Sequence, residues 1–440
     1  MNHSLLLTAL TSMLVASQAI AGKPLRPNIL IIFTDDQGYA DLGCFGSTTH
    51  DTPRMDQLAA QGTKFTSFYA QSVCGPSRSA LLTGRYPVRS GGWHMPAEEV
   101  TWAELLQTVG YHTACIGKWD VSNREEILDR MPNAQGFEYY FGALGANDDG
   151  EILYHENNEP AGASDDMSTI TRLYTNKAID FLATQRDPTK PFALYLAHTM
   201  MHTDIDASPR FKGRSDGGLY GDVVEEFDYE TGRLLDALDR LGLSDDTLVI
   251  FTTDNGPWNQ DRYRRTERGH PEGAKFWGDA GPLRAGKGSS YEAGVRVPCI
   301  VRWPGKVATG TESSALFATL DFLPTFATLA GFDLPTDRTI DGVDQTELLL
   351  GGDSGARDTF LYTTVIPKHA ANGIRRGKWK YLRAEHLVPD YAAVTRDEVP
   401  ELYDLEADIG ETRNLAEEHP DIVRQLREQL DELWADAAGN

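Results

Sequence analysis

The chain has few basic residues and few long apolar segments. Lysine and arginine together number 41 among 440 residues, against 65 aspartates and glutamates, which gives a formal net charge of −24. This balance argues against nucleic acid as a partner, because phosphate backbones bind basic surfaces. After the N-terminal segment, no apolar run is long enough to span a bilayer. We therefore expect no nucleic-acid partner and no membrane span.

The N-terminal segment has the pattern of a secretory signal. The stretch from Leu5 to Ala16 is mostly apolar, and Ala19-Ile20-Ala21 supplies the small residues of a cleavage site. The apolar run is too short for a comfortable membrane span. We predict a signal peptide over residues 1–21, cleavage after Ala21, and a periplasmic or secreted protein.

Apolar runs alternate with helical patterns along most of the chain. Continuous runs of branched apolar residues are typical of buried strands. Strands are predicted at 28–33, 111–116, 192–197, 247–252 and 297–301, and helices at 54–61, 101–109, 167–184 and 219–241. The alternation predicts an α/β domain over residues 22–360, with a large, mostly parallel sheet flanked by helices.

The pattern of predicted strands and helices changes after about residue 359. Residues 371–382 have the pattern of a hairpin, and residues 401–405 that of a further short strand. Residues 419–435 form an amphipathic helical pattern with an apolar stripe of Ile422, Leu426, Leu430 and Leu433. We predict a smaller C-terminal α+β subdomain over residues 361–440, with a short antiparallel sheet and a helix.

Polar residues follow four of the predicted strands. Asp35 and Asp36 follow the first, Lys118 the second, His202 the third and Asp254 the fourth. In open α/β sheets, chemistry takes place at the carboxyl ends of the strands. The sequence therefore predicts that these residues form a single site.

The acidic residues at these strand ends suit a metal ion. Taken alone, Asp35-Asp36 is as well explained by a turn with a side-chain cap. Together with Asp254 and Asn255, however, the pair makes an all-oxygen set, which favours a hard divalent cation, Ca²⁺ before Mg²⁺. No cluster of histidine and cysteine competes for a transition metal.

Residues 74–85 read CGPSRSALLTGR and predict a short helix that ends at Gly84. Pro76 suits the first helical position, where its missing N–H costs nothing. That register places Cys74 just ahead of the helix start. Free backbone N–H groups and the helix dipole attract an anion at this place.

This segment, with its C-x-P-S-R motif, resembles the signature of the type I, formylglycine-dependent sulfatases of the alkaline-phosphatase superfamily. The resemblance spans about residues 26–415, with strong motifs at Asp35, Cys74, Lys118, Asp254 and Lys287. It implies that a formylglycine-generating enzyme oxidises Cys74 to 3-oxoalanine (formylglycine) during maturation. One oxygen of the hydrated aldehyde would then attack the sulfur of a sulfate ester, and the substrate alcohol would leave, which gives a sulfated formylglycine. Loss of the second diol proton would expel inorganic sulfate and return the aldehyde.

The resemblance also implies which residues bind the metal and the nucleophile. Asp35, Asp36, Asp254, Asn255 and the modified Cys74 would hold one Ca²⁺, which orients the sulfate and stabilises charge as a Lewis acid. Arg78, one helical turn from Cys74, would hold the formylglycine diol.

Three further residues match positions that bind the sulfate. Lys118 and Lys287 would act as point charges on the sulfate oxygens, and would supply the positive field that the acidic chain lacks. His202, in the stretch Met-His-Thr-Asp, would bind sulfate or protonate the leaving oxygen. His198 lies earlier at the same strand end, and we interpret it as structural.

Asp120 is the main departure from the family pattern. The family reads Gly-Lys-Trp-His where this chain reads Gly-Lys-Trp-Asp, and the family histidine deprotonates the diol. Asp120 would replace that base if its pKa were raised. Two alternatives stay open: a structural replacement with another group as base, and an enzyme of slow or altered activity.

Aromatic and polar residues in loops after the strand ends suit sugar binding. Of these, His94, Trp258 and His270 are predicted to bind substrate; the full set is Trp93, His94, Trp258, Asn259, Tyr263, Arg264, Arg265, His270 and Trp277. The function predicted is hydrolysis of sulfate esters on a sulfated polysaccharide or oligosaccharide. The alternatives are a phosphonate or phosphate ester hydrolase of the same superfamily and a catalytically impaired protein that binds sulfated glycans.

The cysteines do not form a disulfide framework. Once Cys74 is assigned to the modification, Cys44, Cys115 and Cys299 remain, which is an odd number. Cys115 and Cys299 lie in predicted strands, and we expect both to be free, buried thiols.

Overall fold

The computed structural model describes residues 24–148, 150–258, 277–352, 355–366, 368–389, 394 and 398–439. The predicted signal peptide and His270 lie outside these residues. Within them, every helix is too short or too polar to cross a lipid bilayer.

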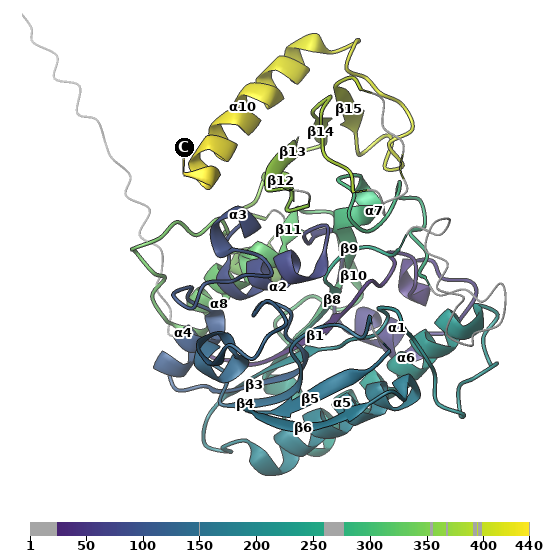
Figure 1. Cartoon of the computed structure of the whole chain (residues 1–440), viewed down its shortest axis with the longest axis vertical. Coiled ribbons are helices and arrows are strands. Elements are labelled where there is room, and N and C mark those ends of the chain that lie inside the picture. The colour runs from purple at the N-terminus through teal and green to yellow at the C-terminus, as the bar shows by residue number, and fades with distance from the viewer. Residues whose placement is uncertain are drawn as a thin grey trace, which may run out of the picture.

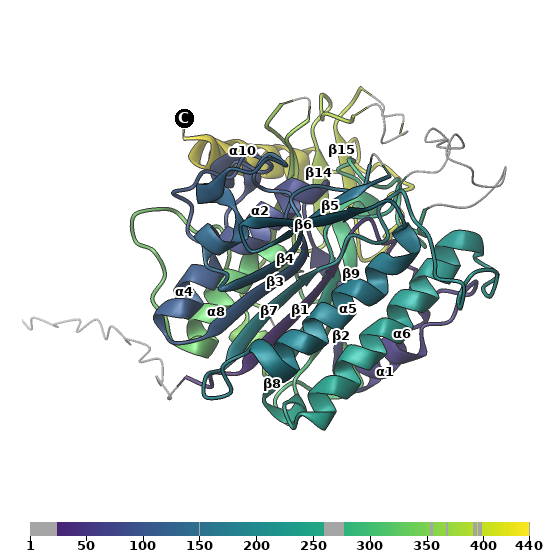
Figure 2. The same cartoon turned by 60° about the horizontal axis from the view of Figure 1, so that its bottom comes forward.

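Five parallel strands form the centre of a large sheet (Figure 2). Their order is β8 (Thr247–Thr253), β1 (Asn28–Thr34), β7 (Phe192–Ala197), β3 (His112–Lys118) and β4 (Tyr139–Ala143). Every residue of β1, β7 and β8 is buried, which explains why their sequences are continuous apolar runs. Because these strands are parallel, the residues that follow them meet at one edge of the sheet.

Further strands extend the sheet on both sides. Beyond β8 lie β9 (Arg296–Arg302), β2 (Thr63–Tyr69), β10 (Thr311–Ser313) and β11 (Phe317–Ala318), and beyond β4 lie β5 (Ile152–Glu156) and β6 (Glu159–Ser164). Strands β9, β5 and β6 join the sheet antiparallel, whereas β10 and β11 pair parallel to β2. The predicted strand 297–301 corresponds to β9, which is antiparallel to both β8 and β2. The segment before β9 therefore returns to the edge where β8 ends.

Helices cover both faces of the sheet (Figure 2). One face carries α1 (Pro53–Ala60), α5 (Ile170–Asp180) and α6 (Gly218–Arg240), and the other carries α2 (Cys74–Thr83), α4 (Trp102–Thr108) and α8 (Phe322–Ala330). The remaining short helices are α3 (Pro87–Ser90), α7 (Glu292–Val295) and α9 (Thr346–Leu349). Two hydrophobic cores result, one on each face, as expected for an α/β fold.

A second, smaller sheet lies at the C-terminal end of the chain (Figure 1). It contains β12 (Thr359–Thr364), β13 (Ala370–Arg376), β14 (Trp379–Leu382) and β15 (Glu401–Asp404), all antiparallel, with α10 (Pro420–Ala438) packed against it. Leu426 and Leu430 are buried, whereas Leu433, predicted on the same stripe, is 37% exposed. The first strand of this sheet, β12, crosses the predicted boundary at residue 360. The position of the domain boundary stays a prediction.

The start of α2 differs from the prediction. The helix begins at Cys74, with Val73 as N-cap, so Pro76 is its third residue and not its first. Pro76 is tolerated there because the first four N–H groups of a helix have no intrahelical partner in any case. Cys74 is thus the first residue of the helix, still at its positive end.

Candidate active site

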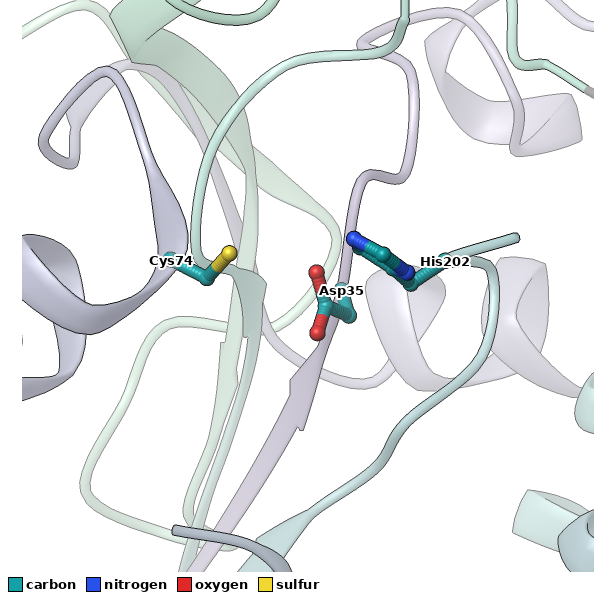
Figure 3. Close-up of side chains that lie close together, drawn as sticks. All are labelled: Asp35, Cys74 and His202. Carbon is teal, nitrogen blue, oxygen red and sulfur yellow. The ribbon is translucent and has the colours of Figure 1, made fainter. Parts of the chain in front are cut away.

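Cys74, Asp35 and His202 converge at the carboxyl edge of the parallel strands (Figure 3). Cys74 opens α2, Asp35 directly follows β1, and His202 lies in the loop after β7. One ligand atom of each lies within 4.8 Å of the other two, and all three side chains are buried. The side chains point toward one another from three separate segments, so the fold brings together what the sequence holds far apart.

Three carboxylates gather beside this group. Oxygens of Asp35, Asp36 and Asp254 lie within 4.8 Å of one another. The backbone N–H of Asp36 donates to Oδ1 of Asp254 (3.2 Å), and Nδ2 of Asn255 donates to Oδ1 of Asp36 (2.7 Å). Asp36 has φ of 57°, a left-handed conformation that aspartate tolerates better than most residues. This turn after β1 brings two consecutive carboxylates to the same centre.

The predicted metal ligands suit a hard cation. Among the described residues, Oδ1 of Asp35, Oδ2 of Asp36 and Oδ1 of Asn255 are buried without a hydrogen-bond donor. A buried acceptor without a donor is costly, and a cation would satisfy all three. Burial and the neighbouring Asp35 raise the pKa of Asp254 to about 8, although Arg78 acts in the opposite direction.

Three buried cations face the carboxylates. Nη2 of Arg78 donates to Asp254 (2.9 Å) and to Asp35 (3.2 Å), and its Nη1 donates to the backbone oxygen of Lys118 (3.0 Å). Nζ of Lys118 lies 2.5 Å from Oδ2 of Asp35. Nζ of Lys287 lies 2.6 Å from Oδ1 of Asp36 and 3.7 Å from Sγ of Cys74.

The two lysines are charged in this setting. Burial alone would lower their pKa values, but the adjacent carboxylates, Asp120 and Asp35 for Lys118 and Asp36 for Lys287, raise both above the usual range. They provide the locally positive groups that an acidic chain needs to bind an anion.

Cys74 itself is held as a thiol. Burial raises its pKa to about 12, although Lys118 and Lys287 act in the opposite direction. The thiolate is the reactive form of cysteine, so an unmodified Cys74 is a poor nucleophile at neutral pH. Its neighbour Gly75 lies against the Trp93 ring, where a Cβ would approach within 2.1 Å. This glycine allows the indole to cover the start of α2.

His202 presents Nε2 to the carboxylates. Its Nδ1 lies 2.7 Å from the backbone oxygen of Thr203 and 3.1 Å from Oδ1 of Asn147, both acceptors, which places the proton on Nδ1. Nε2 lies 3.6 Å from Oδ2 of Asp36. Burial, followed by the charge of Lys287, lowers the pKa of His202, so the ring is neutral at pH 7. Asn147, in the loop after β4, was missed in the sequence because β4 was not recognised.

Comparison with known proteins agrees with this geometry. The family model described as Sulfatase matches residues 27–332, and the model described as N-sulphoglucosamine sulphohydrolase, C-terminal, matches residues 286–436. The chain belongs to the sulfatase family. As a sulfatase it is a sulfuric ester hydrolase.

Two relatives and one solved structure illustrate the similarity. Human arylsulfatase A is 36% identical, over 97% of this chain and 92% of its own length. N-acetylgalactosamine-6-O-sulfatase of Bacteroides thetaiotaomicron is 33% identical, over 93% of each. A structure described with the metabolism of multiple glycosaminoglycans by B. thetaiotaomicron has a TM-score of 0.81 and 31% identity, over 93% of this chain and 99% of that one.

Asp120 occupies a buried, fully paired position in this sulfatase. Its Oδ2 accepts from Nε1 of Trp93 (3.1 Å) and lies 3.5 Å from Nζ of Lys118, and its Oδ1 accepts from Nε of Arg124 (2.8 Å). Burial would raise its pKa, but Lys118 and Arg124 lower it below the usual range. These contacts suit the structural alternative, and the role of Asp120 stays a prediction. Arg124, which the sequence did not single out, bridges Asp120 and Asp148 (2.8 Å).

His198 is a core residue, as expected. It is buried, and burial lowers its pKa to about 3. Its Nδ1 accepts from the backbone N–H of Met200 (3.0 Å), and its ring packs edge-on against Tyr174 and Phe227.

The predicted substrate residues differ in their placement. Trp258 lies in the cluster, with its ring 4.4 Å from Nζ of Lys287 and 6.0 Å from the His202 ring. His94 is exposed and forms a backbone bridge with Ser122, near Asp120. Trp277 packs against the core on the α6 face. His270, with Asn259, Tyr263, Arg264 and Arg265, lies outside the described residues.

Proposed function

We propose that this sulfatase releases inorganic sulfate from sulfated polysaccharides or oligosaccharides. The observation that carries the proposal is the convergence of Cys74, two charged lysines and His202 beside a carboxylate cluster. The names of the relatives support a glycan substrate, since one is an N-acetylgalactosamine-6-O-sulfatase.

Cys74 becomes the nucleophile after oxidation to formylglycine by a maturation enzyme. When formed, the hydrated aldehyde supplies an oxygen nucleophile that the protonated thiol cannot match. Two features of this chain support the modification: the CGPSR sequence at the start of α2, and the position of Sγ of Cys74, 3.7 Å from Nζ of Lys287.

One Ca²⁺ would be held by Asp35, Asp36, Asp254 and Asn255, together with the modified residue 74. Bound there, it would supply Lewis-acid stabilisation of the sulfate oxygens. The three buried acceptors without donors support this assignment.

The remaining steps fall to side chains of the chain itself. Lys118 and Lys287 hold the sulfate, and Arg78 fixes Asp35 and Asp254 in position. His202 presents Nε2 to this site, where it would bind the sulfate or protonate the leaving oxygen. Asp120 stays ionised and holds Lys118, Trp93 and Arg124 in place.

Export to the periplasm or the exterior also belongs to the proposal. It is supported by the apolar run at 5–16 and the Ala19-Ile20-Ala21 site. N-terminal sequencing of protein purified from its host tests it, with Gly22 as the expected first residue.

Sulfate release from a panel of sulfated polysaccharides and their oligosaccharides tests the function. The protein is produced together with a formylglycine-generating enzyme, and Cys74→Ala is the control. We expect free sulfate from at least one glycan and none from the control. Equal release by both proteins would contradict the role of Cys74.

Measurements on the same protein preparation distinguish two alternative functions. Faster turnover of phosphonate than of sulfate esters would favour the phosphonate hydrolase. The departure at Asp120 is the observation that favours an impaired, glycan-binding protein. Tight retention of sulfated glycans without sulfate release, despite an aldehyde at position 74, would support it.

A further inference from the structure

A cavity of about 420 Å³ lies in the C-terminal part of the sulfatase, outside the cluster around Cys74. The loop between β12 and β13 contributes Lys368 and His369, the segment after β14 contributes Arg383 and Glu385, and α10 contributes Trp434. This volume lies within the range of small-molecule sites.

The lining of the cavity combines an aromatic ring with charges. Trp434 is half-buried, whereas Lys368 and Glu385 are exposed. Arg383 is anchored: its Nε donates to the backbone oxygen of Ala371 (3.1 Å), and its guanidinium pairs with Asp431 on α10. Two cations and one carboxylate line the cavity in a chain whose net charge is −24. An indole face with nearby cations suits a ring that carries an anionic group.

Hydrogen bonds tie the wall of the cavity to the active site. Asn372 lines the cavity, and its Nδ2 donates to Oγ of Ser290 (2.7 Å), only three residues after Lys287. Three Cα steps span at most about 11 Å. Gly288, the residue after Lys287, donates from its backbone N–H to the backbone oxygen of Ser72 (2.8 Å), and Ser72 lies two residues before Cys74.

A buried ionic network holds the two regions together. Nζ of Lys380 on β14 lies 3.0 Å from Glu292 and 2.6 Å from Glu411. The hydroxyl of Tyr362 on β12 donates to Glu292 (2.8 Å), five residues after Lys287. Because the C-terminal sheet is joined in this way to the segment that carries Lys287, the cavity keeps a set position relative to the sulfate site.

We propose that this cavity binds an anionic sugar residue of the same glycan whose sulfate lies at Cys74. The inference rests on the proposed glycan substrate. Trp434 stacks on the sugar ring, Lys368 and Arg383 face its sulfate or carboxylate, and Glu385 accepts a hydroxyl. The sulfatase thereby prefers an oligosaccharide to a monosaccharide.

Turnover by the matured enzyme tests the preference. Lys368→Glu reverses an exposed charge in the cavity, and Lys306→Glu reverses an exposed charge outside it as the matched control. On a sulfated chondroitin hexasaccharide, we expect Lys368→Glu and Trp434→Ala to raise KM roughly tenfold with little change in kcat. On N-acetylgalactosamine 6-sulfate, kcat/KM should change less than about twofold. Equal effects on both substrates, or none on the hexasaccharide, would overturn the proposal.

Binding separates this proposal from the proposed function. Binding is measured with proteins that also carry Cys74→Ala, as their retention on a gel that carries the sulfated chondroitin hexasaccharide. We expect Lys368→Glu to weaken this retention and Lys306→Glu to leave it unchanged. An unsulfated chondroitin hexasaccharide and a κ-carrageenan hexasaccharide show whether the carboxylate or the sulfate is recognised. If the wild type released no sulfate from any glycan, the proposed function would fail while this comparison still decided the cavity. If Lys368→Glu bound all three hexasaccharides as tightly as the protein without this change, the proposed sugar site in the cavity would be refuted, even with normal sulfate release.

Discussion

Replacing Asp120 by asparagine tests how the departure from the family pattern works. The substitution keeps the size of the side chain and removes its charge. Oδ1 of Asp120 accepts from Arg124 at 2.8 Å, and Oδ2 lies 3.5 Å from Nζ of Lys118. A hydrogen bond to a charged group contributes about 1.5–3 kcal/mol. We expect Asp120→Asn to lower the free energy of unfolding by about that amount, seen as a lower thermal midpoint.

The effect on catalysis separates the two roles. If Asp120 is the general base, its loss lowers kcat about 10²–10⁴-fold. If Asp120 only holds Lys118 in place, its loss raises KM more than it lowers kcat. Because the pKa of Asp120 is lowered, we expect a smaller fall in kcat, about tenfold or less, with an unchanged pH–rate profile. The assay is initial-rate sulfate release across pH. A fall of about 10²-fold or more, with one limb of the profile lost, would identify Asp120 as the base and refute this reasoning.

Three further predictions concern the metal, the sulfate-binding lysine and the C-terminal network. Treatment with a chelator should lower the thermal midpoint, and Ca²⁺ should restore it, because the cation binds the carboxylates only in the folded protein. At a hundredfold excess over Kd, this binding raises the free energy of unfolding by about 2.7 kcal/mol. A thermal midpoint that changes with neither treatment would contradict the assigned site. Lys287→Gln should lower kcat/KM by about 10²-fold or more, since it removes a buried charge from the sulfate, and a fall of less than about tenfold would exclude that role. Burial, opposed by Lys380, raises the pKa of Glu411 from 4.5 to about 7. The native state then keeps a proton that the unfolded chain releases, so stability falls as pH rises through this window. In Glu411→Gln this fall should be absent from thermal midpoints taken between about pH 5 and 8, and an identical slope in both proteins would count against it.

The central strands were predictable because burial on both faces makes each a continuous apolar run. That applies to β1, β3, β7 and β8. Strands β2 and β6 were missed for physical reasons. β6 is almost wholly exposed and exists through backbone pairing with β5, so its sequence carries no apolar pattern. β2 alternates buried and half-buried residues over polar positions, a weaker signal that period-two counting would have found.

The site was partly visible for the same reason. Asp35, Lys118 and Asp254 end or directly follow recognised strands, and their convergence follows from parallel pairing. The contact of Lys287 with Asp36 could not be derived from the pattern, because it depends on the antiparallel direction of β9. Asn147 was missed because it follows β4, whose sequence Tyr-Tyr-Phe-Gly-Ala is too short to stand out.

The most direct test of the account relates the state of residue 74 to activity. Preparations made with graded amounts of a formylglycine-generating enzyme are compared for two quantities: the fraction of the residue-74 peptide that carries the aldehyde, by mass spectrometry, and the rate of sulfate release from the best glycan substrate. The account predicts a rate proportional to the aldehyde fraction and zero for the pure thiol, whose pKa near 12 leaves it protonated. Full activity in preparations that contain only the thiol would contradict it.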